Sequence, residues 1–278
     1  MRIGIIGAGT MGVGIAHAVA TSGWDALVVE PDATQRGKAR DRLDEVISSG
    51  VTRGKLTRAE ADAALARLAF HSSAAELPEG LDWIIESVPE KLELKRTVLA
   101  EAEQRTPRFL ASNTSALSIT SLAEGLSAPE RFVGMHFFNP VWSMKLVEIV
   151  VAERSQDAAV KAAVDAARGM GKEPIVVKDA PGFASSRLGV LLGLEAIRMV
   201  EEGIASPEDI DKAMTLGYGY PMGPLRLGDL VGLDVRLAIA EHLSQTYGER
   251  FAPPGLLREM VAQGKLGKKS GQGFYSWS

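Results

Sequence analysis

The sequence predicts a doubly wound α/β domain followed by a smaller all-α domain. Short apolar segments rich in Val, Ile and Phe alternate with amphipathic segments along the first part of the chain, as in successive βαβ units. This alternation stops near Asp179, and helical patterns alone follow. The 278 residues are enough for two cores, so we expect domains at 1–180 and 181–278.

The predicted strands are short, and several are apolar throughout, as expected for a parallel sheet buried on both faces. They are Ile3–Ile6, Ala26–Glu30, Asp82–Val88, Arg108–Ser112, Phe132–Phe138, Leu146–Val151 and Pro174–Val177. The segments between them have apolar residues at helical spacing. These helices are Met11–Ser22, Gln35–Ser48, Thr57–Leu68, Lys91–Gln104, Ser118–Gly125 and Asp157–Gly169.

Two of these helices interrupt the simple alternation, because both lie between the second predicted strand and the third. The second of them begins with a capping box, Thr57-Arg-Ala-Glu60. The turn before it carries two cations, Arg53 and Lys55. The sequence therefore predicts a helical hairpin with a basic tip, inserted after the second strand.

The second domain shows three helical signals. An apolar stripe at helical spacing comprises Leu188, Leu191, Leu192, Ala196 and Met199. Another helix is predicted to begin after Ser206, with Pro207 at its first position and two acids in its first turn. Leu233, Leu237 and Ala240 mark a later one.

The composition excludes several classes of function. The chain has no cysteine, which rules out thiolate catalysis, disulfides and Cys-ligated metal, and we expect no metal site. A net charge of −4 argues against a non-specific nucleic-acid binder. No apolar run approaches the roughly 20 residues of a membrane span, and the N-terminal segment lacks the pattern of a signal peptide. We expect a cytoplasmic enzyme with an organic cofactor.

The first predicted strand runs into a glycine motif, Gly7-Ala-Gly9-Thr-Met-Gly12. In a strand–turn–helix context this G-x-G-x-x-G pattern indicates a Rossmann-type dinucleotide site. Gly7 allows the tight turn, Gly9 lets the backbone approach a pyrophosphate, and Gly12 lets the helix pack closely on the strand. An ordinary strand–helix turn and an FAD site are the alternatives.

An acid ends the second predicted strand, 18 residues after the last glycine of the motif. This residue, Glu30, suits hydrogen bonds to the adenosine ribose hydroxyls and would repel a 2′-phosphate, so NAD is favoured over NADP. Arg36 lies six residues further on and keeps NADP open as the alternative.

Only four histidines are available as general bases. His17 falls within a predicted helix and His242 among polar residues of a late one, and we expect His71 to be exposed. His136 instead lies near the carboxyl end of an apolar strand, where ligands bind in such sheets. Glu148 is an acid within the next apolar strand, so it can orient the imidazole of His136. A satisfied core histidine and a structural salt link are the alternatives.

Two further segments border this region. Short polar side chains follow another strand in Ala111-Ser-Asn113-Thr-Ser115. The alternative to a site role is an N-cap for the next helix, and we expect one of them to serve as that cap as well. The only other asparagine, Asn139, follows the His136 strand. Trp142 and Met144 lie in the loop between the His136 and Glu148 strands and could shape a pocket or belong to the core.

Together these segments resemble the L-3-hydroxyacyl-CoA dehydrogenases, and in particular the short 3-hydroxybutyryl-CoA dehydrogenases. The resemblance covers essentially the whole chain. Its motifs are Gly7–Gly12, Glu86-Ser-Val-Pro-Glu90-Lys-Leu-Glu-Leu-Lys95, Ala111–Ser115, His136-Phe-Phe-Asn-Pro140, Lys145-Leu-Val-Glu148, Pro181-Gly-Phe183 and Gly267-Lys-Lys-Ser-Gly-Gln-Gly-Phe-Tyr275.

The resemblance implies a role for each matching residue. His136 is the general base, Glu148 orients it, and Ser115 hydrogen-bonds the reacting oxygens. The positions near NAD are Glu90, Lys95, Asn139 and Lys269. The helical domain at 181–278 is expected to bind substrate and form a homodimer, while the domain at 1–180 binds NAD.

The chain departs from the family pattern at one position. The family motif after Pro-Gly-Phe usually ends in Asn-Arg, whereas this chain has Ser186-Arg187. Serine still donates one hydrogen bond, so we expect Ser186 to contact substrate over a shorter reach. The resemblance also suggests that Arg53 and Lys55 receive coenzyme A phosphates, although a solvated surface turn explains them equally well.

The resulting functional prediction is reversible, NAD-dependent oxidation of an (S)-3-hydroxyacyl-CoA, with a short acyl chain. The alternatives are a dehydrogenase of a free 3-hydroxy acid, such as L-gulonate or carnitine, and a non-catalytic NAD-binding protein comparable to a lens crystallin. Retention of both His136 and Glu148 disfavours the crystallin-like alternative.

Overall fold

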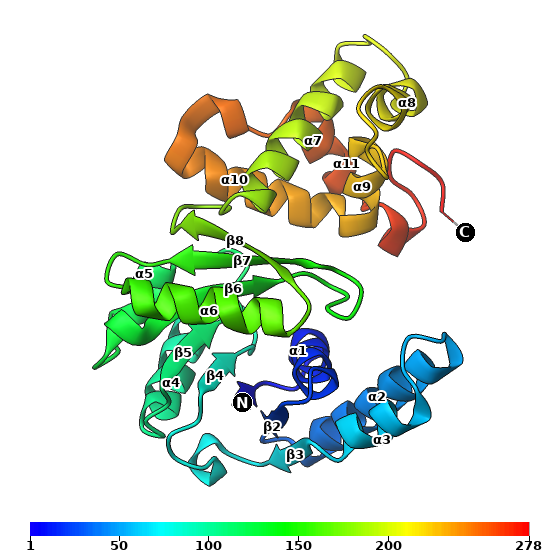
Figure 1. Cartoon of the computed structure of the whole chain (residues 1–278). Coiled ribbons are helices and arrows are strands. Elements are labelled where there is room, and N and C mark those ends of the chain that lie inside the picture. The colour runs from blue at the N-terminus through cyan, green and yellow to red at the C-terminus, as the bar shows by residue number, and fades with distance from the viewer. Residues whose placement is uncertain (278) are drawn as a thin grey trace. The chain divides into compact units, whose positions relative to one another are not determined.

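The computed structural model describes residues 1–277. The chain divides into two compact units, the first spanning Met1–Ala180 and the second beginning at Pro181. All the strands of the described chain belong to the first unit, and the second is built from helices (Figure 1).

The first unit contains one eight-stranded sheet in the order β3-β2-β1-β4-β5-β6-β7-β8. All neighbouring strands are parallel except β6 and β7, which are antiparallel. The strands are β1 Arg2–Ile6, β2 Asp25–Val29, β3 Leu68–His71, β4 Trp83–Glu86, β5 Phe109–Ser112, β6 Phe132–Phe137, β7 Leu146–Val151 and β8 Glu173–Lys178. This mostly parallel sheet with helices on its faces confirms the predicted doubly wound α/β class.

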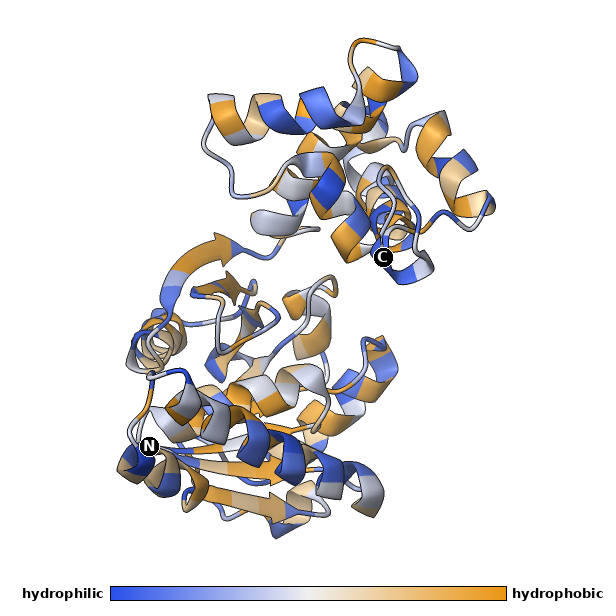
Figure 2. Ribbon diagram, turned by 90° about the vertical axis from the view of Figure 1, so that its right-hand side faces the viewer, coloured by the Kyte–Doolittle hydropathy of each residue, from blue (hydrophilic) through white to orange (hydrophobic). Residues whose placement is uncertain are grey.

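Helices cover both faces of the sheet because its central strands are apolar on both sides. Every residue of β4 and β6 is buried, and the strands are coloured as largely hydrophobic in Figure 2. Residues of α1, α2 and α6 share one core with the sheet, while α4 contacts β4 and β5, and α5 contacts β6. The helices are α1 Thr10–Thr21, α2 Ala33–Thr52, α3 Arg58–Leu65, α4 Leu92–Glu103, α5 Ile119–Ala123 and α6 Asp157–Gly169.

The predicted hairpin is present as α2 and α3, and Thr57 and Glu60 form the expected capping box. The segment after the capping box differs from the prediction. The predicted helix to Leu68 ends at Leu65, and Leu68–His71 forms the edge strand β3, which pairs with β2. A four-residue, half-buried edge strand containing Leu and Ala has no strong period of its own, so pairing with β2 decides its conformation. His71 is consequently half-buried in this strand, not exposed.

Within residues 181–277, five α-helices pack around a core of their own. These are α7 Ser185–Glu201, α8 Pro207–Gly217, α9 Pro224–Val231, α10 Leu233–Tyr247 and α11 Gly255–Ala262. Ser206 caps α8 as predicted, accepting a hydrogen bond from the Asp209 N–H. Two buried acids fix the C-terminal segment: Asp211 accepts from the Tyr275 hydroxyl, and Asp229 accepts from the Phe274 and Tyr275 backbone N–H groups.

The helix α7 forms where the stripe of leucines predicts it, but its first turns do not bury that stripe. Leu188 is 68% exposed, and the buried face carries Val190, Leu194 and Ile197 instead. Further exposed apolar residues of this unit include Leu216, Tyr218 and Val231. The second unit therefore has several large apolar side chains on its surface that its own core does not bury, as is typical of an interaction surface. Among residues 1–277, no helix has the length and hydrophobicity that a membrane crossing needs.

Candidate active site

The glycine loop has the backbone that a dinucleotide site needs. Gly7 has a φ of +102°, which favours glycine, and a Cβ on Gly12 would lie 1.8 Å from the Gly7 carbonyl oxygen. Gly9 precedes α1 without any side-chain cap, and nothing lies within 4 Å of the position of its missing Cβ. The N-terminus of α1 thus offers its N–H groups to open space, which suits a phosphate.

This loop forms one wall of a cavity of about 960 Å³, near the upper end of the size of small-molecule sites. The cavity follows the carboxyl ends of β1, β2, β4, β5 and β6, where doubly wound sheets bind ligands. Its lining includes the predicted site residues Gly7, Gly9, Glu30, Glu90, Ser115, His136 and Asn139. The fold thereby brings together residues from across the first 139 positions of the chain.

Glu30 lies directly after β2 and faces the glycine loop. Its Oε2 accepts a hydrogen bond from the Ala8 N–H at 3.2 Å, and its Oε1 accepts one from the Asp32 N–H. Arg36, the residue that kept NADP open, donates instead to the Glu30 and Pro31 carbonyl oxygens. The carboxylate therefore remains the charged group on this part of the cavity wall, as an NAD site requires.

His136 and Glu148 face each other across the antiparallel pair of β6 and β7. The two residues are direct partners in the strand register, and Nδ1 of His136 lies 2.8 Å from Oε2 of Glu148. Glu148 is fully buried, whereas His136 is 8% exposed and lines the cavity. Because a carboxylate only accepts, Nδ1 is the donor in this contact, and the ring's lone pair is on Nε2. The predicted juxtaposition is present, and its geometry suits a general base.

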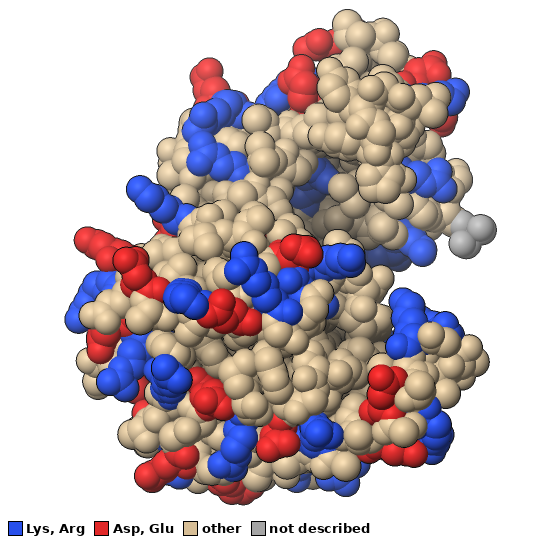
Figure 3. Space-filling view, in the orientation of Figure 1, with Lys and Arg blue, Asp and Glu red and all other residues tan. Residues whose placement is uncertain are grey.

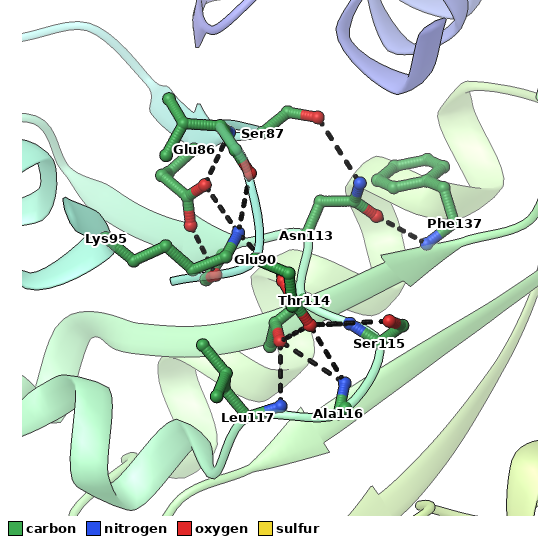
Figure 4. A network of polar contacts seen from close by, with 12 residues as sticks. Glu86, Ser87, Glu90, Lys95, Asn113, Thr114, Ser115, Ala116, Leu117 and Phe137 are labelled. Atoms are coloured by element: carbon green, nitrogen blue, oxygen red, sulfur yellow. Dashed lines mark hydrogen bonds and ion pairs between the residues drawn. The ribbon is translucent and has the colours of Figure 1, made fainter. Parts of the chain in front are cut away.

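A second polar network lies under the loop after β5 (Figure 4). The Glu90 Oε1 accepts hydrogen bonds from the Thr114 hydroxyl at 2.5 Å, the Ser115 N–H at 2.9 Å and the Ala116 N–H at 3.1 Å. Burial raises the pKa of Glu90, but the Thr114 hydrogen bond, the Lys95 charge and the two backbone donors together outweigh it and lower this pKa. Glu90 is therefore a stable carboxylate on the cavity wall.

Lys95 lies beneath this network instead of on the cavity wall. Its side chain is fully buried, and its Nζ lies 2.7 Å from Oε1 of Glu86 and 3.3 Å from Oε2 of Glu90. In this position Lys95 supports Glu90 from behind the cavity wall.

Glu86, Ser87 and Asn113 hold the strand ends together; of these, only Asn113 belongs to the polar strand-end cluster that the sequence singles out. Glu86 accepts from the Ser112 hydroxyl and the Val88 N–H. Asn113 donates to the Ser87 hydroxyl and accepts from the Phe137 N–H, so it joins three neighbouring strands (Figure 4). Like Glu30 and Glu148, Glu86 is an acid within or at the end of an apolar strand, and this pattern could have indicated its place in the site.

Other expectations near the site are also resolved. The residue that caps α5 is Ser118, so no member of Ala111–Ser115 serves as its N-cap. Trp142 and Met144 are not among the lining residues of the cavity. Trp142 packs edge-on against His17, with ring centroids 6.0 Å apart.

Four predicted residues lie away from these contacts. Arg53 and Lys55 are exposed at the tip of the hairpin of α2 and α3, where Figure 3 shows a group of Lys and Arg side chains. In the second unit, Ser186 lies in the first turn of α7, and Lys269 forms an ion pair of 2.5 Å with Asp234. Within residues 1–277, no group of three or more His, Asp or Glu side chains is arranged to hold a metal ion.

A glycine loop at the end of β1, an acid after β2 and a carboxylate-supported histidine define an NAD-dependent dehydrogenase of the α/β class. Residues 2–180 match the NAD binding domain of 3-hydroxyacyl-CoA dehydrogenase, and residues 182–277 match the C-terminal domain of the same family. The chain belongs to the 3-hydroxyacyl-CoA dehydrogenase family.

Individual relatives agree over the whole chain. A 3-hydroxybutyryl-CoA dehydrogenase of Mycobacterium tuberculosis is 40% identical over 99% of this chain and 98% of its own length. A probable 3-hydroxybutyryl-CoA dehydrogenase of Deinococcus radiodurans is 39% identical over 100% of both chains. The crystal structure of (S)-3-hydroxybutyryl-CoA dehydrogenase from Ralstonia eutropha is 40% identical, covers 100% of this chain and 99% of that one, and superposes with a TM-score of 0.95.

Proposed function

We propose that the chain reversibly oxidises short (S)-3-hydroxyacyl-CoA esters, 3-hydroxybutyryl-CoA above all, to the 3-ketoacyl-CoA. The observation that carries the proposal is the His136–Glu148 pair, 2.8 Å apart, on the wall of the cavity that begins at the glycine loop. The names of the relatives from M. tuberculosis, D. radiodurans and R. eutropha support the substrate class.

In this proposal the residues divide the work of one two-electron oxidation. NAD, when bound along the glycine loop and Glu30, supplies the acceptor for the hydride that leaves C3. The Nε2 of His136 takes the hydroxyl proton as the C3–O bond becomes a carbonyl, and Glu148 stabilises the imidazolium. Ser115, exposed beside Glu90, hydrogen-bonds the substrate oxygen, and Asn139 borders the cofactor.

The direct test is the loss of NADH absorbance with 3-ketoacyl-CoA esters of increasing chain length, compared with free 3-oxo acids. We expect turnover with acetoacetyl-CoA and a decline as the acyl chain lengthens. Turnover confined to the free acids would favour the L-gulonate or carnitine type. Binding of NADH without turnover of any 3-oxo compound would favour a crystallin-like protein.

The basic hairpin tip supports the CoA ester over a free acid. Arg53 and Lys55 are exposed, and neither forms an ion pair within the described residues. Coenzyme A carries phosphates that such side chains attract in a salt-dependent way. In an Arg53→Ala, Lys55→Ala variant, we expect KM for acetoacetyl-CoA to rise about tenfold at low salt, and the difference to shrink as salt is added.

The helical unit supplies the remaining part of the proposal. We place substrate contact at Ser186 and self-association on the apolar surface of residues 181–278, where Leu216 is 84% and Tyr218 is 77% exposed. A Leu188→Asp, Val231→Asp variant is expected to sediment as a monomer, unlike the parent chain. The absence of a candidate membrane helix among residues 1–277 and the bacterial relatives support a cytoplasmic location.

A further inference from the structure

We propose that Glu90 and the buried Glu86–Lys95 pair behind it selectively stabilise the cationic nicotinamide of NAD⁺ over the neutral ring of NADH. In this way they set the balance between the two directions of the reaction. The inference rests on the proposed function, because it requires the cofactor to lie in the cavity that Glu90 lines.

The cluster of Glu86, Glu90 and Lys95 carries more negative than positive charge. Two carboxylates, Glu86 and Glu90, share the single ammonium of Lys95 at 2.7 Å and 3.3 Å. Among the ion pairs of residues 1–277, no other cation contacts either acid. The Glu86 carboxylate, the Glu90 carboxylate and the Lys95 ammonium therefore leave the cluster with one net negative charge.

Only one of the two carboxylates of this cluster faces the cavity. Glu86 and Lys95 are fully buried and do not line the cavity, whereas the Glu90 side chain is 35% exposed and does. Figure 4 shows Lys95 between the two acids, with Thr114, Ser115 and Ala116 donating to Glu90 from the other side. The negative charge of the cluster therefore reaches the cavity through Glu90, whose hydrogen-bond donors in the loop of residues 114–116 are uncharged and do not neutralise it.

The reaction moves a positive charge from the nicotinamide ring to the imidazole of His136. On oxidation, the hydroxyl proton passes to His136 and the C3 hydride to the nicotinamide ring, so one positive charge leaves the ring and one appears on the imidazole. The imidazole has its own carboxylate, Glu148, at 2.8 Å. Glu90 therefore stabilises the site before oxidation and Glu148 stabilises it afterwards, which keeps both directions accessible.

Binding separates this role from catalysis. The dissociation constants of NAD⁺ and of NADH would be measured by titration calorimetry for the parent chain and for Glu90→Gln. We expect the constant for NAD⁺ to rise about tenfold relative to that for NADH, the size of a charge interaction across several ångströms of protein. Glu86→Gln changes the same net charge from outside the cavity, so it should shift the ratio in the same direction by a smaller factor.

Two further variants serve as controls. Glu93→Gln removes a negative charge from the same helix, α4, but Glu93 is 84% exposed and pairs with Arg96, so the ratio should not change. Glu90→Asp keeps the charge and shortens the side chain, so it should weaken both forms of the cofactor equally. An equal loss of both affinities in Glu90→Gln would overturn the proposal and leave Glu90 as a positioning residue. If the parent chain binds neither form, the proposed function itself fails.

Discussion

Two histidines near the loop between β6 and β7 show how differently one fold treats the same side chain. His136 has the Glu148 carboxylate at 2.8 Å and reaches the cavity. His17, on α1, has a buried Nδ1 without a hydrogen-bond partner among the described residues, and it contacts Trp142. Burial and the charge of Lys172 lower the pKa of His17 to about 4. In this fold, only the histidine that has both a carboxylate partner and access to the cavity is placed to act as a general base.

Replacing His136 should give the largest effect. In His136→Gln the general base is lost, so we expect kcat to fall about a thousandfold, within the usual range for such a group. His17→Phe is the matched control, because it removes the other imidazole near this loop and should change kcat by no more than about threefold. Stopped-flow and steady-state rates with acetoacetyl-CoA and NADH would measure both. Comparable losses in the two variants would break the comparison.

Removing the carboxylate of Glu148, the partner of His136, should have the next largest effect on kcat. In Glu148→Gln, the amide neither stabilises the imidazolium nor enforces the tautomer as a carboxylate does, so we expect kcat to fall about a hundredfold. Circular dichroism would verify that the variant is folded, since Glu148 is fully buried. An unchanged kcat would show that His136 works without its partner.

His17 should instead affect how the free energy of unfolding depends on pH. The folded-state pKa of His17 is about 4, against 6.5 for an ordinary histidine. Between about pH 4 and pH 6.5 the unfolded chain therefore binds more protons at His17 than the folded chain does. The stability of the fold with a neutral His17 is complete above pH 6.5 and is lost progressively as the pH falls toward about 4. We expect His17 to cost about 2 kcal/mol by about pH 5. Urea unfolding at about pH 7 and about pH 5 should show a smaller difference in His17→Phe than in the parent chain.

The smallest expected effect concerns Lys172, the cation beside His17. Its Nζ donates to the carbonyl oxygens of Val141 and Met144 in the β6–β7 loop, and burial lowers its pKa. Lys172→Met should cost about 1 kcal/mol, since two carbonyls lose a donor while a buried charge is removed. Because Lys172 lowers the pKa of His17, this pKa should rise in the variant. NMR titration of the His17 ring would measure the rise, with Lys161→Met, at an exposed lysine, as the control.

Local patterns alone were enough for much of the fold. The apolar strands, the capping box at Thr57 and the glycine loop each depend on residues within one short segment, and all three form as predicted. The edge strand β3 was missed because its four residues carry no period, and only hydrogen bonds to β2 make it a strand. The exposure of Leu188 on α7 could likewise not be predicted, because helical spacing of leucines does not tell which side of the helix packs on the core.

The candidate site likewise has a part that local sequence patterns predict and a part that depends on tertiary contacts. By itself the sequence determined which residue types were available: three acids within or ending apolar strands, one histidine near a strand end and a glycine loop. The tertiary structure decided their partners, pairing His136 with Glu148 through the antiparallel register and placing Lys95 between Glu86 and Glu90. The physical reason is that an ion pair depends on distances of a few ångströms between separate elements. Such distances follow from strand order and register, which no single segment of the chain encodes.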